Sequence, residues 1–192
     1  MQKNWKTKIN HFGGSPVDGA GKSTTAKLLA EKLNLPIEHH GPVKSLEEGK
    51  NEYFNFVNGP KYSVIKDRFA MGEVTYSQIY RNYKADYMKE LEEALMEKYD
   101  AHLFFITGDA DFLQKRLEKR GEDFLQIEDL QHISDLCNEY YEDSILPKTK
   151  LFAEVGSEKN CDIILKVLDG RLLHEQITSA IKACLYKIGG QK

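Results

Sequence analysis

The stretch Asp18-Gly-Ala-Gly-Lys-Ser-Thr24 limits the fold of this chain more than any other part of its sequence. It lies between a short apolar run and a helical pattern, so we expect it to join a strand to a helix. Its glycines leave backbone N–H groups free to point at one anion, and the positive end of the following helix strengthens the attraction. The lysine can reach the terminal phosphates of a nucleotide, and the serine hydroxyl can bind Mg²⁺. The stretch therefore predicts a polyphosphate-binding loop made of Asp18, Gly19, Ala20, Gly21, Lys22, Ser23 and Thr24.

This loop departs from the full Walker pattern at one position. Five residues before Gly21, where that pattern has glycine, the chain has Pro16. Proline fixes φ and has no N–H, so it stiffens the mouth of the loop. Gly13 and Gly14 lie just upstream and could make the turn instead. A plain glycine-rich turn before a helix is the alternative interpretation.

Length and charge narrow the class of protein. With 192 residues, of which 41% are hydrophobic, the chain is long enough for one well-packed domain, and we expect residues 1–192 to form it. The net charge of −3 creates no overall field that would attract nucleic acid or an anionic membrane. Three scattered cysteines suit a reduced compartment better than a disulfide framework. No apolar run of about 18 residues and no signal-peptide pattern is present, so we expect a cytoplasmic protein.

Strand and helix patterns alternate along the chain. Short apolar runs predict strands at 7–12, 35–40, 62–66, 102–107, 151–155 and 161–168. Apolar residues at helical spacing predict helices around 26–33, 45–57, 72–83, 87–95, 109–120, 130–140 and 173–185. This alternation predicts an α/β fold, in which a mainly parallel sheet of about five strands has helices on both faces.

Asp67 and Arg68 follow the predicted strand at 62–66. In open α/β sheets ligands bind at the carboxyl ends of the strands, where a carboxylate can hold Mg²⁺ through water. The guanidinium group of Arg68 could grip an acceptor phosphate with two parallel hydrogen bonds. A surface ion pair or a turn is the simpler interpretation.

A cluster of basic residues ends the helix predicted at 109–120, and its members are Lys115, Arg116, Lys119 and Arg120. Their charges could simply balance the negative end of the helix dipole. Because Gly121-Glu-Asp follows, the region around 115–128 could also form a mobile lid, whose arginines close over bound nucleotide and exclude water.

Glu38, His39 and His40 lie together at the end of the second predicted strand. Adjacent histidines in a strand face opposite sides, so we do not expect them to share a metal ion. Glu38 is either a surface carboxylate or a general base for a substrate hydroxyl.

Three blocks of the chain together resemble the thymidylate kinase and deoxynucleoside monophosphate kinase group of P-loop proteins, in particular its short phage-type members. The blocks are the phosphate loop, the segment from Val64-Ile-Lys-Asp-Arg-Phe69 through Val74-Thr-Tyr76 to Tyr80-Arg81, and Arg116-Leu-Glu-Lys-Arg120-Gly-Glu-Asp. Their order and spacing agree with the family from about residue 7 to 168. The resemblance implies a three-layer nucleoside-monophosphate-kinase-like sandwich with a small helical lid. Gly72 stands where the family often has serine.

The resemblance also implies roles for individual residues. The loop would bind the phosphates of ATP, and Mg²⁺ would be held by Ser23 and Asp67. The catalytic residues it implies are Lys22, Asp67, Arg68, Arg116 and Arg120. The acceptor-binding residues it implies are Arg68, Tyr76, Arg81 and Glu38.

The leading hypothesis is a kinase that uses ATP and Mg²⁺ to phosphorylate a deoxynucleoside monophosphate to the diphosphate. Its partners would be small nucleotides, without nucleic acid or membrane. One alternative is a deoxynucleoside kinase that uses Glu38 as its base. Another is a nucleotide-binding regulator that has lost catalysis, which Pro16 and the polar residues of the first strand suggest. The sequence leaves open whether the chain is a monomer or a homodimer.

Overall fold

The computed structural model describes residues 9–14, 19–59, 62–119, 121 and 127–170. At its centre is a five-stranded sheet with strand order β2-β3-β1-β4-β5. All of its neighbouring strands are parallel. The strands are β1 (Ile9–Gly14), β2 (Ile37–His39), β3 (Val64–Asp67), β4 (His102–Thr107) and β5 (Lys148–Phe152).

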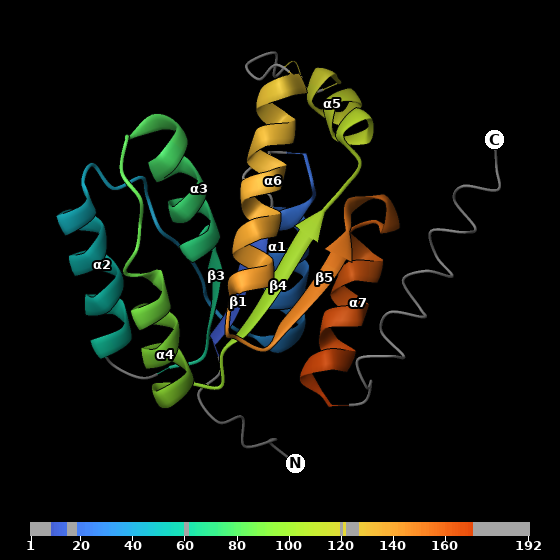
Figure 1. Ribbon diagram of the computed structural model, residues 1–192. Coiled ribbons are helices and arrows are strands. Elements are labelled where there is room, and N and C mark those ends of the chain that lie inside the picture. Colours follow the sequence, from blue (N-terminus) through green and yellow to red (C-terminus); the bar gives the residue numbers. More distant parts are fainter. Residues whose placement is uncertain (1–8, 15–18, 60–61, 120, 122–126, 171–192) are drawn as a thin grey trace.

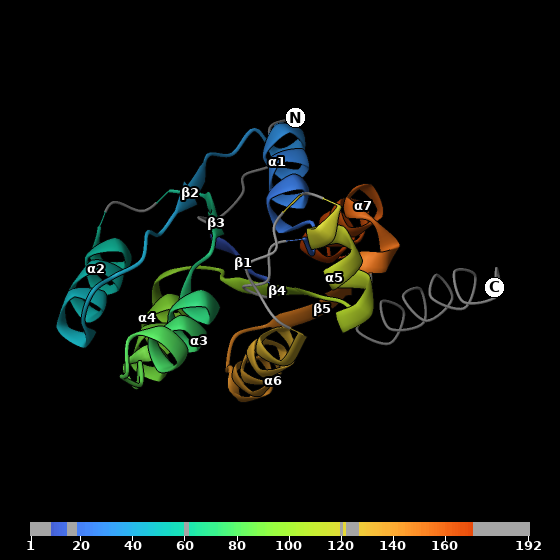
Figure 2. The same ribbon diagram turned by 90° about the horizontal axis from the view of Figure 1, so that it is seen from above.

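Helices cover both faces of the sheet (Figure 1). Helix α1 (Lys22–Leu33) packs against α7 (Ser157–Leu168) on one face, whereas α3 (Ala70–Tyr80) packs against α6 (Ile127–Asp143) on the other. Helix α4 (Met88–Lys98) lies on the same face of the sheet as α3. It packs against α2 (Leu46–Asn58), which lies beyond the end of the sheet formed by β3 and β2 (Figure 2). Helix α5 (Ala110–Glu118) follows the carboxyl end of β4. The predicted three-layer α/β architecture is therefore confirmed.

The central residues of strand β4 are completely buried. Its residues Leu103–Ile106 have 0% of their surface exposed. They lie between β1 and β5, and helices cover both faces of the sheet. A strand in this position is buried on both faces, so its residues are apolar without alternation. Asp109 begins the next helix as predicted, because its carboxylate accepts a hydrogen bond from the backbone N–H of Phe112 at 3.2 Å.

The strand predicted at 161–168 is wrong, because this segment belongs to helix α7. Cys161 and Ile164 are both fully buried. Residues three apart share one face of a helix but would lie on opposite faces of a strand. The run was ambiguous because a short apolar stretch suits either element. The preceding strand ends at Phe152, and Ala153–Val155 form a 3₁₀ turn instead of continuing it. The predicted helix at 173–185 lies outside the described residues.

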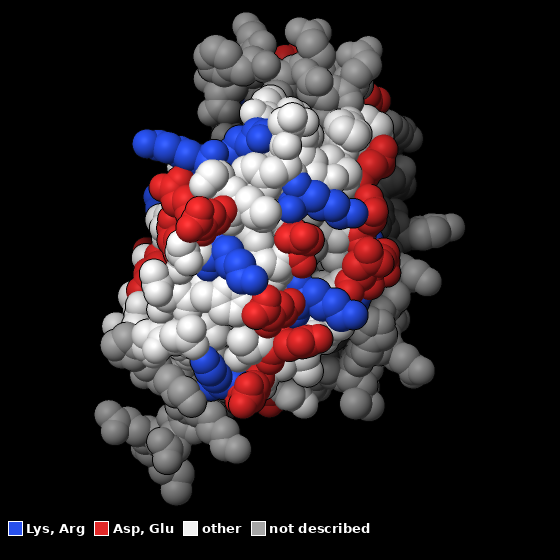
Figure 3. Space-filling view, turned by 60° about the vertical axis from the view of Figure 1, so that its left-hand side comes forward, with Lys and Arg blue, Asp and Glu red and all other residues white. Residues whose placement is uncertain are grey.

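Charges of both signs mix on the face that carries α2 and α4. Figure 3 shows lysines and arginines interspersed with acidic residues over this face, without a large area of either sign. Lys50 and Glu90 form one such ion pair, at 3.2 Å between α2 and α4. Among the described helices, none has the length and apolar character needed to cross a bilayer.

Gly49 allows α2 to approach its neighbours closely. A methyl group on its Cα would lie 2.5 Å from the hydroxyl oxygen of Tyr87 and 3.1 Å from a methyl of Val43. Alanine would improve helix propensity by about 1 kcal/mol. The rigid, buried ring of Tyr87 prevents relief of the clash, so we expect Gly49→Ala to lower the free energy of unfolding by about 1–3 kcal/mol. Urea denaturation measures this change.

The matched control is Gly72→Ala, in α3. A methyl group on Gly72 would meet no described atom within 4 Å. Only the gain in helix propensity then remains, so this variant should be as stable as the wild type or up to about 1 kcal/mol more stable. If Gly49→Ala behaved like Gly72→Ala, the close approach of α2 to Tyr87 would be contradicted.

Candidate functional site

The described part of the phosphate loop lies where the chain enters α1. Gly21 is the N-cap of this helix, with φ of 86°. A side chain at Gly21 would be strained by this left-handed backbone, and its Cβ would lie 2.8 Å from Oγ of Ser157. Lys22, the first residue of the helix, is only 4% exposed, whereas Ser23 and Thr24 are exposed. The backbone N–H groups of the first helical turn can therefore face an anion at this point. Asp18 lies outside the described residues.

Ser23 and Asp67 meet across the carboxyl edge of the sheet. The Ser23 hydroxyl donates a hydrogen bond to Oδ2 of Asp67 at 3.0 Å. Asp67 ends β3 and is 1% exposed. Its other carboxylate oxygen, Oδ1, is buried and has no hydrogen-bond partner among the described residues. A buried, unpaired carboxylate oxygen is costly unless a cation or donor joins it.

This pair suits Mg²⁺, because hydroxyl and carboxylate oxygens are ligands that Mg²⁺ prefers. The described residues contain no group of three or more His, Cys, Asp and Glu side chains that could hold a metal ion by themselves. That donor set fits a metal that arrives with a nucleotide, because Mg²⁺ at such sites is bound by one or two protein groups together with substrate phosphates and water.

His39 lies beside Asp67, and the sequence did not identify it as part of the site. Its Nδ1 atom is 3.4 Å from Oδ2 of Asp67, and its side chain is 59% exposed. In the parallel register His39 pairs with Asp67, and Glu38 pairs with Lys66. Since neighbouring residues of a strand face opposite sides, His39 is on the side of Ser23 and Glu38 is on the other side. Only the register, which no local sequence signal specifies, reveals this.

Glu38 is held by two donors on its own side of the sheet. The Nζ atom of Lys66 lies 2.5 Å from its Oε2, and the hydroxyl of Tyr62 donates to its Oε1. Burial raises the pKa of Glu38, but the hydrogen bonds from Lys66 and Tyr62 outweigh burial and lower it. A carboxylate with two donors and a lowered pKa is a weak proton acceptor. The geometry therefore gives no support to Glu38 as the base of a nucleoside kinase.

His40 connects Lys66 to α2. Its Nε2 atom is 3.0 Å from Nζ of Lys66, and its Nδ1 atom is 2.8 Å from Oε1 of Glu52. Its ring stacks on Tyr53 with a centroid distance of 4.8 Å. Burial and the positive charge of Lys66 lower the pKa of His40, and the carboxylates of Glu52 and Glu38 only partly offset them.

A lowered pKa of His40 predicts that acid destabilises the fold. Because the pKa is lower in the folded chain than the usual value near 6.5, the unfolded chain binds the proton first as the pH falls. Stability should therefore be complete above about pH 6.5 and should decrease towards the folded pKa, by at most about 1.4 kcal/mol per pH unit. Urea unfolding at several pH values between about 7.5 and 5 measures this slope.

The His40→Gln variant should show a smaller slope than the wild type in this range. His132→Gln is the control, because His132 is exposed on α6. Its slope should match that of the wild type. Equal slopes in His40→Gln and in the wild type would show that another group is responsible.

Helix α5 packs on the phosphate loop from the β4 side. A methyl group on Gly19 would lie 3.4 Å from Cδ2 of Leu117, and one on Gly21 would lie 4.0 Å from Nη1 of Arg116. The guanidinium carbon of Arg116 also lies 5.6 Å from the centre of the Phe112 ring. Arg116 is therefore beside the loop, as the lid hypothesis requires. Arg120 and residues 122–126 of the predicted lid are outside the described residues.

The residues expected to bind the acceptor have different environments. Arg68 is exposed and has a φ of 61°, a left-handed conformation that is rare outside glycine and common at functional sites. Tyr76 is partly exposed on α3, and its ring lies 5.6 Å from that of Tyr80. Arg81 instead donates to Oε2 of Glu73 at 2.9 Å and to the backbone carbonyl of Val43 at 2.7 Å.

Comparisons with known proteins show what this chain is similar to. No protein-family model matches it. It is 26% identical to the SPbeta prophage-derived uncharacterized protein YorR of Bacillus subtilis over 123 residues, which are 62% of this chain and 73% of that protein. The crystal structure of YorR in complex with phosphorylated GDP has a TM-score of 0.71 and 24% identity, and the match covers 86% of this chain and 99% of that one.

Two further solved structures are kinases. Deoxyadenosine kinase from M. mycoides with bound dATP has a TM-score of 0.58 and 17% identity, over 84% of this chain and 99% of that one. Shikimate kinase from Bacteroides thetaiotaomicron has a TM-score of 0.53 and 16% identity, over 86% of this chain and 99% of that one. At these identities the likeness is one of fold. The chain therefore has the α/β fold of P-loop kinases, as its phosphate loop and alternating elements predicted.

Proposed function

We propose that this protein is a nucleotide kinase that transfers a phosphoryl group from ATP to a deoxynucleoside monophosphate. The hydrogen bond between Ser23 and Asp67, beside the N-terminus of α1, carries the proposal. It joins a residue of the phosphate loop to a carboxylate at a neighbouring strand end, and one of that carboxylate's buried oxygens has no described partner. The nucleotides named with the solved structures of YorR and deoxyadenosine kinase support a nucleotide substrate.

Phosphoryl transfer requires positioning and neutralisation of the charge that spreads over the transferred group. The loop from Asp18 to Thr24 binds the phosphates of ATP, and Lys22 neutralises part of the charge of the transferred group. Arg116 lies beside the loop and adds positive charge, together with Arg120 of the lid at about 115–128. Ser23 and Asp67 hold Mg²⁺, which when bound screens the charge of the donor phosphates.

The acceptor side contains Arg68 and Tyr76. Arg68 anchors the acceptor phosphate, and Tyr76 contacts the rest of the nucleotide. A monophosphate acceptor is already ionised and needs no general base, which agrees with the engagement of Glu38 by Lys66. The side chains of Glu38 and Arg81 are engaged by other groups of the protein, so in this proposal neither touches the acceptor.

A coupled assay of ADP release over a panel of acceptors tests the proposal. The panel contains the four common deoxynucleoside monophosphates and their nucleosides, with and without Mg²⁺. We expect turnover with at least one monophosphate, dependent on Mg²⁺, and none with nucleosides. Turnover with nucleosides alone would identify a nucleoside kinase. Tight ATP binding by calorimetry without turnover on any acceptor would identify a nucleotide-binding regulator.

A further inference from the structure

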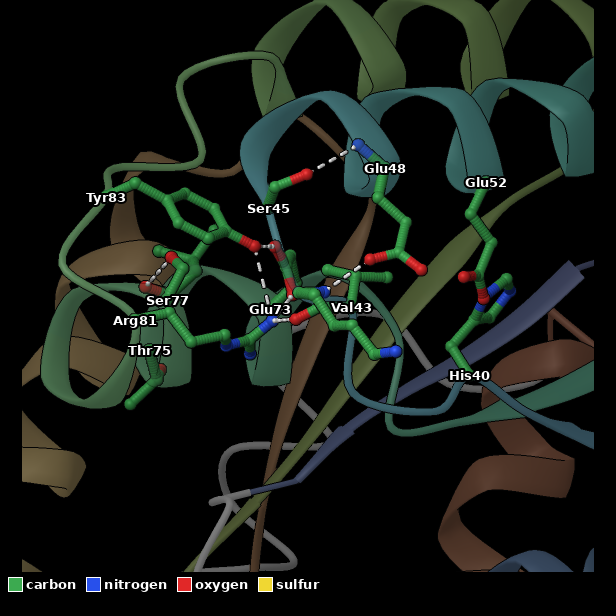
Figure 4. A network of polar contacts seen from close by, with 12 residues as sticks. His40, Val43, Ser45, Glu48, Glu52, Glu73, Thr75, Ser77, Arg81 and Tyr83 are labelled. Atoms are coloured by element: carbon green, nitrogen blue, oxygen red, sulfur yellow. Dashed lines mark hydrogen bonds and ion pairs between the residues drawn. The ribbon is translucent and has the colours of Figure 1, made fainter.

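Glu73 is a buried carboxylate that the proposed phosphoryl transfer does not use. It lies on α3 and is 3% exposed. Arg81 donates to its Oε2 at 2.9 Å, and the hydroxyl of Tyr83 donates to its Oε1 at 2.5 Å. The hydroxyl of Tyr87 reaches the same Oε1 at 3.4 Å. Figure 4 shows Glu73 beside Arg81 and Tyr83, between α3 and the start of α2.

The same pair also holds the segment that connects β2 to α2, which comprises residues 40–45. The nitrogen of Arg81 that contacts Glu73, Nη1, donates to the backbone carbonyl of Val43 at 2.7 Å. Val43 is 2% exposed, so this carbonyl requires a donor from the protein. One guanidinium group therefore ties α3 to the middle of segment 40–45.

Both ends of segment 40–45 are held as well. At its start, His40 contacts Glu52 of α2 at 2.8 Å. At its end, Ser45 caps α2 by accepting from the N–H of Glu48 at 3.2 Å, and the carboxylate of Glu48 accepts from the N–H of Lys44 at 2.6 Å (Figure 4). Between these ends, Arg81 provides the contact that fixes the segment against α3.

The strand order places segment 40–45 on one side of the phosphate loop. Strands β3 and β2 lie on one side of the central β1, and β4 and β5 lie on the other. Arg116 of α5, after β4, covers the loop from the second side. Segment 40–45 follows the carboxyl end of β2, and α3 begins three residues after Asp67, so both flank the first side. If ATP occupies the loop and the side of α5, the acceptor must lie between segment 40–45 and α3.

We propose that the Glu73–Arg81 pair positions segment 40–45 against α3 and so sets the shape of the acceptor site. These are positioning residues, and the inference rests on the proposed kinase function. A buried ion pair often contributes no more stability than apolar packing would, because both charges lose their hydration. What the pair contributes is orientation. Nη1 of Arg81 donates to both the Glu73 carboxylate and the Val43 carbonyl, so it fixes the position of Val43 relative to α3.

Two variants and one control test this inference. Glu73→Gln removes the charge that holds Arg81. Tyr83→Phe is a milder change: it removes a hydroxyl that donates to Glu73 and accepts from Nη1 of Arg81 at 3.2 Å, but it leaves the Glu73–Arg81 ion pair in place. The control is Glu90→Gln, which breaks the ion pair between Lys50 of α2 and Glu90 of α4. The side chains of Lys50 and Glu90 are 52% and 61% exposed, respectively. The measurements are hydrogen exchange of backbone amides in 40–45 and the KM values for the monophosphate and for ATP.

In Glu73→Gln we expect both the exchange rate in 40–45 and the KM for the monophosphate to rise by about tenfold, because a charge-assisted hydrogen bond is lost. The KM for ATP should stay within about twofold, since in this arrangement ATP occupies the loop and the side of α5, away from segment 40–45. Tyr83→Phe should show smaller changes in the same direction, and Glu90→Gln should match the wild type.

Equal increases in both KM values, or unchanged exchange in 40–45 in Glu73→Gln and Tyr83→Phe, would overturn the inference even in an active kinase. A wild-type protein that turns over no monophosphate would instead overturn the proposed function, and the acceptor part of the inference with it. The exchange data and the wild-type assay thus separate the two failures.

Discussion

Replacing Lys22 by alanine should lower kcat for nucleotide phosphorylation by about 100- to 1,000-fold, the usual loss when one preorganised electrostatic contact to the transition state is removed. Lys22 is the first residue of α1 and is 4% exposed, directly after the left-handed Gly21. In the proposed mechanism its ammonium group neutralises charge on the transferred phosphoryl group. Steady-state kinetics at saturating ATP measures the effect.

The control for Lys22→Ala is Lys27→Ala, which removes an exposed lysine from the same helix. It should keep kcat within about twofold, because a surface charge outside the loop adds little to the transition state. Circular dichroism should show that both variants fold. A folded Lys22→Ala protein with kcat near that of the wild type would contradict the role of this loop in catalysis.

Replacing Asp67 by asparagine should raise the Mg²⁺ concentration needed for half-maximal activity and lower the rate at physiological Mg²⁺, by about 10- to 100-fold. Asparagine keeps the size of the side chain and an oxygen that can accept from the Ser23 hydroxyl, but it removes the charge that attracts the cation. A Mg²⁺ titration of the rate, with binding of Mn²⁺ in the presence of ATP as a second readout, measures the change.

Asp86→Asn is the matched control, because Asp86 is exposed in the turn before α4. It should leave the Mg²⁺ titration unchanged. An Asp67→Asn protein with the wild-type Mg²⁺ requirement would show that the buried Oδ1 of Asp67 serves the fold rather than the cation.

Elements with strong local signals were predicted well from the sequence. The strand at 102–107 coincides with β4, because a run of large apolar residues in a central strand has few alternatives. Ser45 and Asp109 begin α2 and α5 as N-caps, since a side-chain oxygen can accept from the N–H three residues later wherever a helix starts. In contrast, residues 161–168 were predicted as a strand and form a helix. A short apolar run fits either element, and here its packing against α1 decides between them.

The sequence by itself determined the phosphate loop, the carboxylate at the end of β3 and the alternating α/β plan, because glycines, helix caps and apolar periodicity act over a few residues. Only the tertiary structure placed His39 beside Asp67, Glu38 on Lys66 and Arg81 between Glu73 and Val43. The physical reason is that these contacts depend on strand register and helix packing. A shift of one residue in register turns a side chain to the opposite face of the sheet, and the local sequence does not set that register.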